Sequence, residues 1–322
     1  MKTGKKIEFD AGVLDDELRT ALDLRQLYFE NGFSRSRIGK FERYDLYREH
    51  KDFLVCENVI SFSDTDGSLL ALKPDVTLSI ISGFDDSSSK AHKVYYDEDV
   101  FRVSGWTGRF KCCRQVGLEC FGKVSGSDFP LVLNLAMESL ARLDGQYVIA
   151  LSDMNIALKA LGLFCKTEAE KAQAAALAKS KNHAGLRSFI AGRAGNQNGR
   201  LDVLMSLFGL VSAPYSGCLD DVRRICSELN AVKEYDSFRR LFDDDRISGN
   251  AEHIQIDFSL LGDMSYYSGL YFNGFVGNSG EAVLSGGEYE KLLRKMGKKG
   301  KAIGFAVYLD RLGNLRRSAE KC

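Results

Sequence analysis

Gln115 and Glu119 are the two residues of this sequence whose types and spacing best suit the binding of a small ligand. They lie four positions apart in a β-rich run, so their side chains would leave the same strand face from points roughly 13 Å apart, at about 3.3 Å per residue. An amide and a carboxylate placed in this way could hold two ends of a polar ligand. Alternating polar residues are also typical of a strand face that meets water, so the pair alone leaves both interpretations open.

Other segments carry polar groups suited to binding, and each also has an ordinary structural explanation. Asp75 lies two residues before Thr77, and Tyr266-Tyr267 precede a predicted turn. Gly286-Gly287 could let backbone approach a ligand, although a glycine pair that ends a strand is more often a plain turn. No G-x-G-x-x-G or G-x-x-x-x-G-K-[ST] pattern occurs, which argues against dinucleotide and P-loop sites.

The cysteines and histidines do not predict a metal site. The eight cysteines include no C-x-x-C pair, and the four histidines are far apart in the sequence. Structural zinc sites usually need such close pairs of ligands. We therefore interpret the cysteines as reduced thiols that pack as small apolar residues, and we expect neither a metal nor another cofactor.

Helical and β-rich segments both occur along the chain, and its two best-defined strands are expected to be antiparallel neighbours, which is compatible with an α+β fold. The periodicity predicts helices over 14–28 and 128–143, strands over 93–103 and 110–121 that pair as antiparallel neighbours, further strands within 253–258, 266–275 and 282–285, and a last helix over 304–312. Thr167 and Glu170 form a capping box that opens an Ala- and Leu-rich helical region. We expect a discontinuous core domain, 1–164 with 249–322, interrupted by a helical insertion domain, 165–248.

The composition restricts the partners of the chain. The 322 residues carry 44 Lys plus Arg and 44 Asp plus Glu, and a neutral protein lacks the positive surface that nucleic-acid binding requires. No apolar run approaches the roughly 20 residues of a membrane span. The first nine residues contain no apolar signal segment. We therefore expect a cytoplasmic protein with neither a nucleic-acid nor a membrane partner.

Seven segments, taken in order, resemble histidyl-tRNA synthetase. They are L-A-L-K-P-D-V-T (70–77), V-F-R (100–102), G-R-F-K (108–111), R-Q-V-G-L-E (114–119), Y-Y-S-G (266–269), S-G-G-E-Y (285–289) and G-F-A-V-Y-L-D-R-L (304–312). The resemblance implies the antiparallel sheet of class II aminoacyl-tRNA synthetases, flanked by helices. The aspartate of K-P-D-V-T, where the synthetase has glutamate, makes the chain similar to the regulatory subunit of short-form ATP phosphoribosyltransferase, a paralogue of the synthetase. A chain that ends soon after the last motif is expected to lack the anticodon-binding domain.

The resemblance also implies a histidine-binding pocket. It places Asp75, Thr77 and Gln115 around the α-amino group, and Glu119 with a tyrosine of the Tyr266-Tyr267 pair around the imidazole. Such acceptors suit a charged amine and an imidazole NH. We also assign Arg109 to the pocket. Together with Arg102 and Arg311 it matches synthetase positions that hold the phosphates of ATP, and an ordinary arginine at the surface or at the rim of the core is the equal alternative.

The chain departs from the synthetase where the chemistry needs positive charge. Gly262 stands where the synthetase has an arginine before its tyrosine pair, and no Lys or Arg occurs between Arg246 and Lys291. Stabilising charge on a transferring phosphate is worth about 2.7 to 4 kcal/mol for one such group. Ser104 and Gly105 replace charged residues of the second motif, and Gly39 replaces the proline of the dimer-forming first motif.

These departures favour a subunit without catalytic residues of its own. We expect it to bind the short-form catalytic subunit of ATP phosphoribosyltransferase, to take histidine as effector in feedback on histidine biosynthesis, and to form a homodimer within the hetero-oligomer. The alternative is a degenerate synthetase-like enzyme that still forms histidyl-adenylate.

Overall fold

The computed structural model describes residues 14–54, 59–85, 88–104, 107–195, 197–212 and 214–312. The predicted features at 1–9, Cys56, Gly105 and Cys322 lie outside these residues. No helix in the described ranges is long and apolar enough to cross a bilayer.

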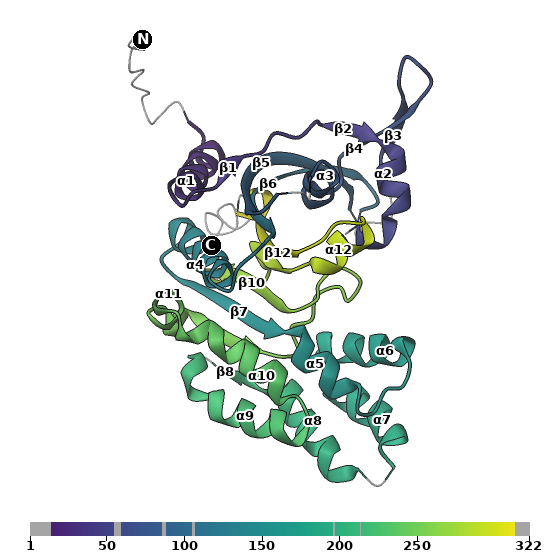
Figure 1. Ribbon diagram of the computed structural model, residues 1–322, viewed down its shortest axis with the longest axis vertical. Coiled ribbons are helices and arrows are strands. Elements are labelled where there is room, and N and C mark those ends of the chain that lie inside the picture. The colour runs from purple at the N-terminus through teal and green to yellow at the C-terminus, as the bar shows by residue number, and fades with distance from the viewer. Residues whose placement is uncertain are drawn as a thin grey trace.

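A large mixed sheet forms the centre of the molecule (Figure 1). Within the described residues its nine strands run in the order β1 (Ser34–Arg35), β5 (Ala91–Val103), β6 (Phe110–Gly122), β12 (Lys301–Tyr308), β11 (Leu284–Glu288), β10 (Leu270–Val276), β7 (Tyr147–Asp153), β9 (Ile254–Asp257) and β8 (Val211–Ser212). The strands from β5 to β7 pair antiparallel, whereas β1 with β5 and β7 with β9 pair parallel. A second sheet has the order β2 (Phe41–Arg43), β4 (Leu69–Leu72) and β3 (Ser61–Ser63).

Helices α1 (Asp16–Glu30) and α4 (Asp128–Leu143) pack together against one face of the large sheet. Tyr28 links them, because its hydroxyl lies 2.9 Å from that of Ser139 and its ring packs edge-on against Phe305 of β12. The other face carries α3 (Val76–Ser82) and α12 (Glu290–Lys295), while α2 (Tyr44–Glu49) covers the small sheet. The candidate pocket lies on this second face.

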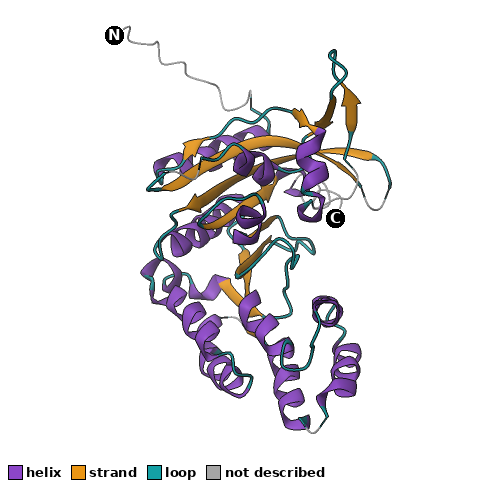
Figure 2. Cartoon of the chain, turned by 45° about the vertical axis from the view of Figure 1, so that its right-hand side comes forward, coloured by secondary structure: helices purple, strands orange, loops and turns teal. Residues whose placement is uncertain are grey.

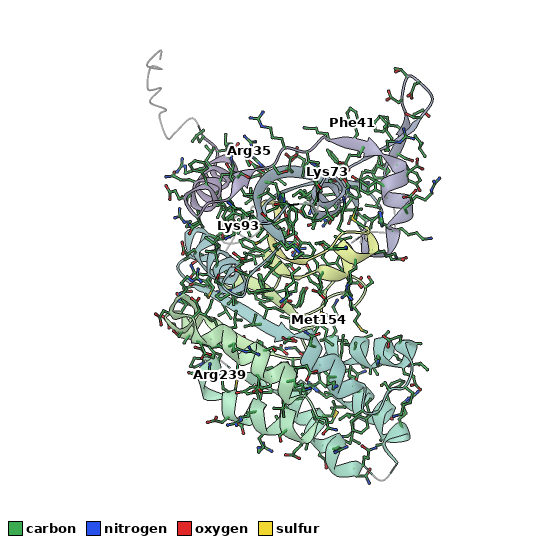
Figure 3. The ribbon with its side chains drawn as sticks, in the orientation of Figure 1. Arg35, Phe41, Lys73, Lys93, Met154 and Arg239 are labelled. Atoms are coloured by element: carbon green, nitrogen blue, oxygen red, sulfur yellow. The ribbon has the colours of Figure 1, made fainter. Side chains whose placement is uncertain are left out.

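The helical region predicted at 165–248 contains α6 (Glu168–Lys179), α7 (His183–Ala194), α8 (Asn198–Gly209), α9 (Leu219–Glu228), α10 (Val232–Arg239) and α11 (Asp245–Ser248). These helices gather at one end of the molecule, below the sheet (Figure 2). The chain enters them through α5 (Met154–Leu161), whose first residue is labelled in Figure 3. The capping box of Thr167 and Glu170 is confirmed at the start of α6.

The region is not purely helical, and the limits of the two domains stay a prediction. Its short strand β8 pairs with β9 of the core, so the large sheet continues into the insertion. The chain also forms short 3-10 helices over Lys51–Phe53, Tyr215–Gly217, Arg240–Asp243 and Ala251–His253.

The antiparallel pairing predicted for β5 and β6 is confirmed. The helix predicted over 304–312 is wrong for its first five residues, because Lys301–Tyr308 forms β12 and a helical turn begins only at Leu309. This strand lies at the centre of the sheet between β6 and β11. A strand buried on both faces reads as a continuous apolar run, which lacks the two-residue alternation that identifies an exposed strand.

Candidate functional site

A cavity of about 420 Å³ opens on the second face of the large sheet. Its lining includes six of the seven residues predicted to bind a ligand: Asp75, Thr77, Gln115, Glu119, Tyr266 and Tyr267. The seventh, Arg109, is exposed in the turn between β5 and β6 and does not line the cavity. The structure thus gathers six of these residues from three separate segments and leaves Arg109 apart from them.

Glu119 of β6 is buried at the floor of the cavity, with 2% of its surface exposed. The Thr77 hydroxyl donates to its Oε1 at 2.6 Å, and the Tyr289 hydroxyl donates to its Oε2 at 2.5 Å. Burial raises the pKa of Glu119 to about 8, and the two hydroxyls offset part of that rise. The carboxyl group is therefore mostly protonated at neutral pH, and a cationic ligand group beside it would favour its ionised form.

Two glycines make room for side chains that cross the floor of the cavity. A Cβ atom on Gly304 of β12 would lie 1.8 Å from Oε2 of Glu119, the residue paired with it across the sheet. A Cβ atom on Gly117 would lie 2.6 Å from the hydroxyl oxygen of Tyr96. Any larger residue at either position would displace a pocket side chain, so both glycines belong to the site.

Asp75 connects the cavity to the start of α3. Its Oδ1 accepts from the backbone N–H of Leu78 at 2.8 Å as the helix N-cap. Its Oδ2 lies 3.9 Å from the guanidinium of Arg102, which also donates to the Pro74 carbonyl at 2.9 Å. Burial raises the pKa of Asp75, and Arg102 offsets part of this effect. Asp75 is thus a constrained acceptor with an arginine beside it.

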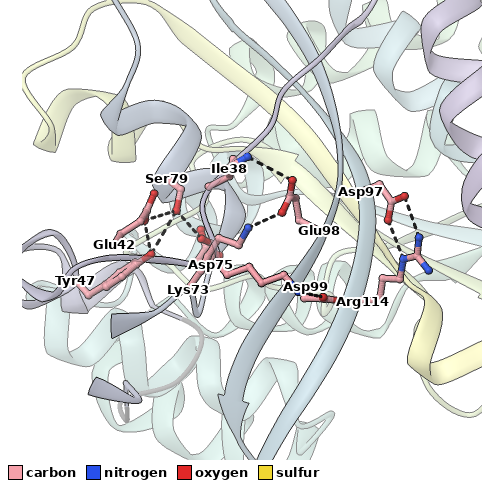
Figure 4. A network of polar contacts seen from close by, with 11 residues as sticks. Ile38, Glu42, Tyr47, Lys73, Asp75, Ser79, Asp97, Glu98, Asp99 and Arg114 are labelled. Carbon is pink, nitrogen blue, oxygen red and sulfur yellow. Dashed lines mark hydrogen bonds and ion pairs between the residues drawn. The ribbon is translucent and has the colours of Figure 1, made fainter. Parts of the chain in front are cut away.

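A buried polar network supports the segment that carries Asp75 (Figure 4). Lys73 is fully buried, and its Nζ lies 2.8 Å from Oε2 of Glu98. The other oxygen of Glu98 accepts from the Ile38 N–H at 3.3 Å. On the far side of the segment, the hydroxyls of Tyr47 and Ser79 donate to Glu42 at 2.5 and 2.7 Å. Removing one partner of such a buried ion pair typically costs 3 to 5 kcal/mol, so the network holds the segment rigidly.

Two polar atoms of the lining are buried and lack a hydrogen-bond partner among the described residues. They are Nε2 of Gln115 on β6 and Oδ1 of Asn273 on β10. Gln115 is only 3% exposed. A buried polar group without a partner is uncommon in folded proteins and costs about 1 to 3 kcal/mol. One donor and one acceptor are therefore available to a ligand in this cavity.

Tyrosine rings form one wall of the cavity and lie close to Gly262, the position where the resemblance implies an arginine in the synthetase. The ring centroids of Tyr266 and Tyr267 are 4.7 Å apart, and those of Tyr267 and Tyr271 are 4.6 Å apart. A Cβ atom on Gly262 would lie 2.5 Å from Cδ2 of Tyr267 and 3.0 Å from Cδ2 of Tyr271. The tyrosine ring thus occupies the space from which an arginine side chain would start.

Lys179, Asp263, Arg102 and Arg311 are the charged residues that line the cavity besides Asp75 and Glu119. Within the described ranges, no group of three His, Cys, Asp or Glu side chains could hold a metal ion.

Sequence reasoning did not assign Tyr289, Asn273 or Lys179 to the site. Tyr289 closes the S-G-G-E-Y segment, so the motif contained the signal. Asn273 lies two residues beyond Tyr271 on the same strand face, a spacing that also could have pointed to it. Lys179 lies in the insertion, and no sequence pattern links it to the core.

Comparison with known proteins decides the family. The family model described as histidyl-tRNA synthetase matches residues 15–312. The chain belongs to this family. The solved structures similar to it include an ATP phosphoribosyltransferase regulatory subunit/histidyl-tRNA synthetase from Bacillus halodurans, with a TM-score of 0.77 and 22% identity over 96% of this chain and 83% of the other. The predicted class II fold is therefore confirmed.

Curated members of the family extend the comparison. The ATP phosphoribosyltransferase regulatory subunits of Alkaliphilus metalliredigens and Oceanobacillus iheyensis are each 26% identical to this chain. The alignments cover 90% and 92% of this chain and 74% of each relative. A chain of the ATP phosphoribosyltransferase HisG:HisZ complex from Thermotoga maritima has the same fold, with a TM-score of 0.67 and 18% identity over 91% of this chain and 97% of the other.

Proposed function

We propose that this chain is the regulatory subunit of a two-chain ATP phosphoribosyltransferase, with no catalysis of its own. Gly262 carries this proposal: the resemblance implies an arginine at this position in the synthetase, where it stabilises a transferring phosphate, whereas here a Cβ atom would already lie 2.5 Å from the Tyr267 ring. The names of the curated relatives support the same function. The partner is then the short-form catalytic chain, and the complex acts in the first step of histidine biosynthesis in the cytoplasm.

We further infer that the cavity binds histidine as the effector. Glu119 can accept from the imidazole NH or pair with the imidazolium, since a charge-assisted hydrogen bond is favourable in so buried a place. Asp75 offers a carboxylate to the α-amino group, and Gln115 offers its unpaired amide. These groups support an amino acid with a basic side chain as the ligand.

A homodimer within the hetero-oligomer is part of the proposal. The small sheet exposes Phe41 and Phe62, which are 54% and 40% exposed and stack edge to face with ring centroids 5.6 Å apart. Self-association that covered these rings would bury apolar surface that otherwise faces water. Sedimentation of the chain alone tests this element independently of the partner.

Co-expression with a short-form catalytic subunit tests the regulatory function. We expect the two chains to copurify, and the formation of phosphoribosyl-ATP by the catalytic chain to rise in the presence of this chain. Added histidine should reduce the rate of the complex. The wild-type chain is compared with Glu119→Gln and with the control Glu49→Gln, whose side chain is exposed on α2 away from the cavity. The control should respond to histidine as the wild type does.

Three outcomes would overturn parts of the proposal. A chain that leaves the rate of the catalytic subunit unchanged would refute the regulatory function. Histidine-dependent exchange of pyrophosphate into ATP by the purified chain would favour the enzyme instead. Equal inhibition of the wild-type and Glu119→Gln complexes would place the histidine site elsewhere.

A further inference from the structure

Lys179 brings a positive charge from the insertion to the cavity in the core. It is the last residue of α6 and lines the cavity together with residues of β6, β10, β11 and β12. Its side chain is exposed and has no hydrogen bond or ion pair to the residues that the structure describes. A lysine without a partner at the mouth of a pocket is available to an anionic group of a ligand.

The other cations of the lining are already bonded to the protein. Arg102 donates to the Pro74 carbonyl at 2.9 Å and lies 3.9 Å from Asp75. Arg311 donates to the Ala282 carbonyl, and its Nε lies 3.5 Å from Oε1 of Glu281. The Arg311 guanidinium also stacks over the ring of Tyr308, 4.1 Å from the centroid.

A salt bridge fixes the end of α6 near the segment that lacks the synthetase arginine. Nζ of Lys181, two residues beyond Lys179, lies 3.0 Å from Oδ2 of Asp257. Asp257 is the last residue of β9 and is 6% exposed. From there the chain continues through Gly262 to the pocket tyrosines. Lys179 and Gly262 are therefore each within five residues of the same contact between the insertion and the core.

We propose that Lys179 binds the carboxylate of the amino-acid ligand, so that an occupied pocket joins the insertion to the sheet. The inference rests on the proposed function, which makes histidine the effector. The buried groups suit the amine and the imidazole: Asp75 and Glu119 are acids, and Asn273 offers an unpaired acceptor. A ligand carboxylate needs a cation instead, and Lys179 is the lining cation without a protein partner in the described ranges.

Through this contact, a ligand bound in the pocket would hold the insertion in one position relative to the sheet. A ligand stabilises one arrangement of two bodies only to the extent that it contacts that arrangement better than others. Histidine bridges the floor of the cavity and α6 through its two ends. An analogue that keeps the amine and the imidazole but lacks the carboxylate would bind the floor without joining the insertion to it.

The test measures two ligands against a set of lysine variants. Calorimetry compares L-histidine with L-histidinol, which has an alcohol in place of the carboxylate, on the wild type, Lys179→Ala and Lys179→Arg. Lys233→Ala is the control, because it removes an exposed lysine of the insertion that lies outside the cavity. A lysine–carboxylate contact that is partly solvated predicts a roughly 3- to 30-fold weaker affinity of Lys179→Ala for histidine. Its affinity for histidinol should change less than about twofold, and Lys179→Arg should bind histidine nearly as the wild type does.

Hydrogen exchange of the α6 amides reports the bridge itself. Histidine should slow exchange over Glu168–Lys179 in the wild type and in Lys233→Ala, whereas histidinol should not, and Lys179→Ala should lose the protection.

The outcomes separate the failure of this inference from that of the proposed function. If histidine does not bind the wild type, the proposed effector site is wrong. If histidine binds but Lys179→Ala weakens both ligands equally, or neither, the carboxylate contact is refuted while the effector site stands. An equal loss would show that Lys179 acts on the pocket through the end of α6, where a cation also stabilises the helix terminus.

Discussion

Replacing Glu119 with glutamine should make the folded chain more stable at alkaline pH while weakening the binding of histidine. The substitution keeps the shape of the side chain and its ability to bond the hydroxyls of Thr77 and Tyr289, and it removes the titrating proton. In the wild type, burial raises the pKa of Glu119 from 4.5 to about 8. The carboxyl group therefore ionises in the unfolded chain at a lower pH than in the folded chain.

The sign of the effect follows from proton binding. Between about pH 4.5 and about pH 8 the folded chain retains a proton that the unfolded chain has lost, so stability decreases as pH rises through this range. At 1.36 kcal/mol per pH unit, the full interval corresponds to a loss on the order of 5 kcal/mol, of which roughly 2 kcal/mol falls between pH 6 and pH 8. Glutamine does not titrate, so the variant should avoid this loss.

Chemical denaturation of both proteins at a series of pH values measures the effect. Burial also raises the pKa of Glu288 to about 7 and that of Asp153 to about 6, so the wild type should lose stability for these reasons as well. Both groups remain in the variant, and the difference between the two proteins isolates Glu119. That difference should grow in favour of Glu119→Gln by roughly 2 kcal/mol from pH 6 to pH 8.

Parallel stability curves over this range would refute the reasoning, because they would mean that Glu119 is already ionised in the folded chain at pH 6. Calorimetry on the same variant should show a 10- to 150-fold loss of affinity for histidine, the equivalent of one charge-assisted hydrogen bond of about 1.5 to 3 kcal/mol. Unchanged affinity would remove Glu119 from the ligand site even if its pKa were high.

Two further substitutions test the lining of the cavity. Gln115→Met should leave the free energy of unfolding within about 0.5 kcal/mol of the wild type, because Nε2 has no partner among the described residues. Calorimetry should show weaker binding of histidine by this variant. A loss of several kcal/mol in stability would show that the amide is bonded within the protein. Gly262→Arg should cost about 1 to 3 kcal/mol in denaturation and should bind histidine less tightly, because the new side chain must displace Tyr267. Tighter binding by this variant would mean that the ring moves aside easily and that the missing arginine can simply be restored.

The sequence predicted the parts of the fold that local chemistry determines. Thr167 and Glu170 form their capping box because both partners lie within one helical turn. Gln115 and Glu119 line one cavity because the strand repeat places them on the same face. The pocket residues could be assigned only from the order of the seven motifs, because each polar pair alone also fits a strand face that meets water.

Other features depend on contacts that the local sequence does not contain. The segment at 304–308 was expected to be helical, because a central strand has no polar face to give it a two-residue period. Burial raises the pKa of Glu119, and the hydroxyls that offset part of this rise belong to Thr77 and Tyr289, which are distant in the sequence. Lys179 reaches the cavity only because the insertion folds back onto the core.

The position of β12 has a consequence for how the chain folds as it is synthesised. This strand pairs with β6 on one side and β11 on the other, yet it begins at Lys301, about 180 residues after β6 ends at Gly122. At 5 to 20 residues per second, the ribosome needs roughly 10 to 35 s to add that length, whereas a hairpin such as β5 with β6 forms in about 1 to 10 μs. The edge of β6 that pairs with β12 therefore stays unpaired until β12 has been synthesised. During this time its backbone N–H and C=O groups can form hydrogen bonds with incorrect strands. The insertion helices mostly contact their neighbours in the sequence, so they can fold before β12 is available. The insertion can therefore be folded before the core sheet is complete.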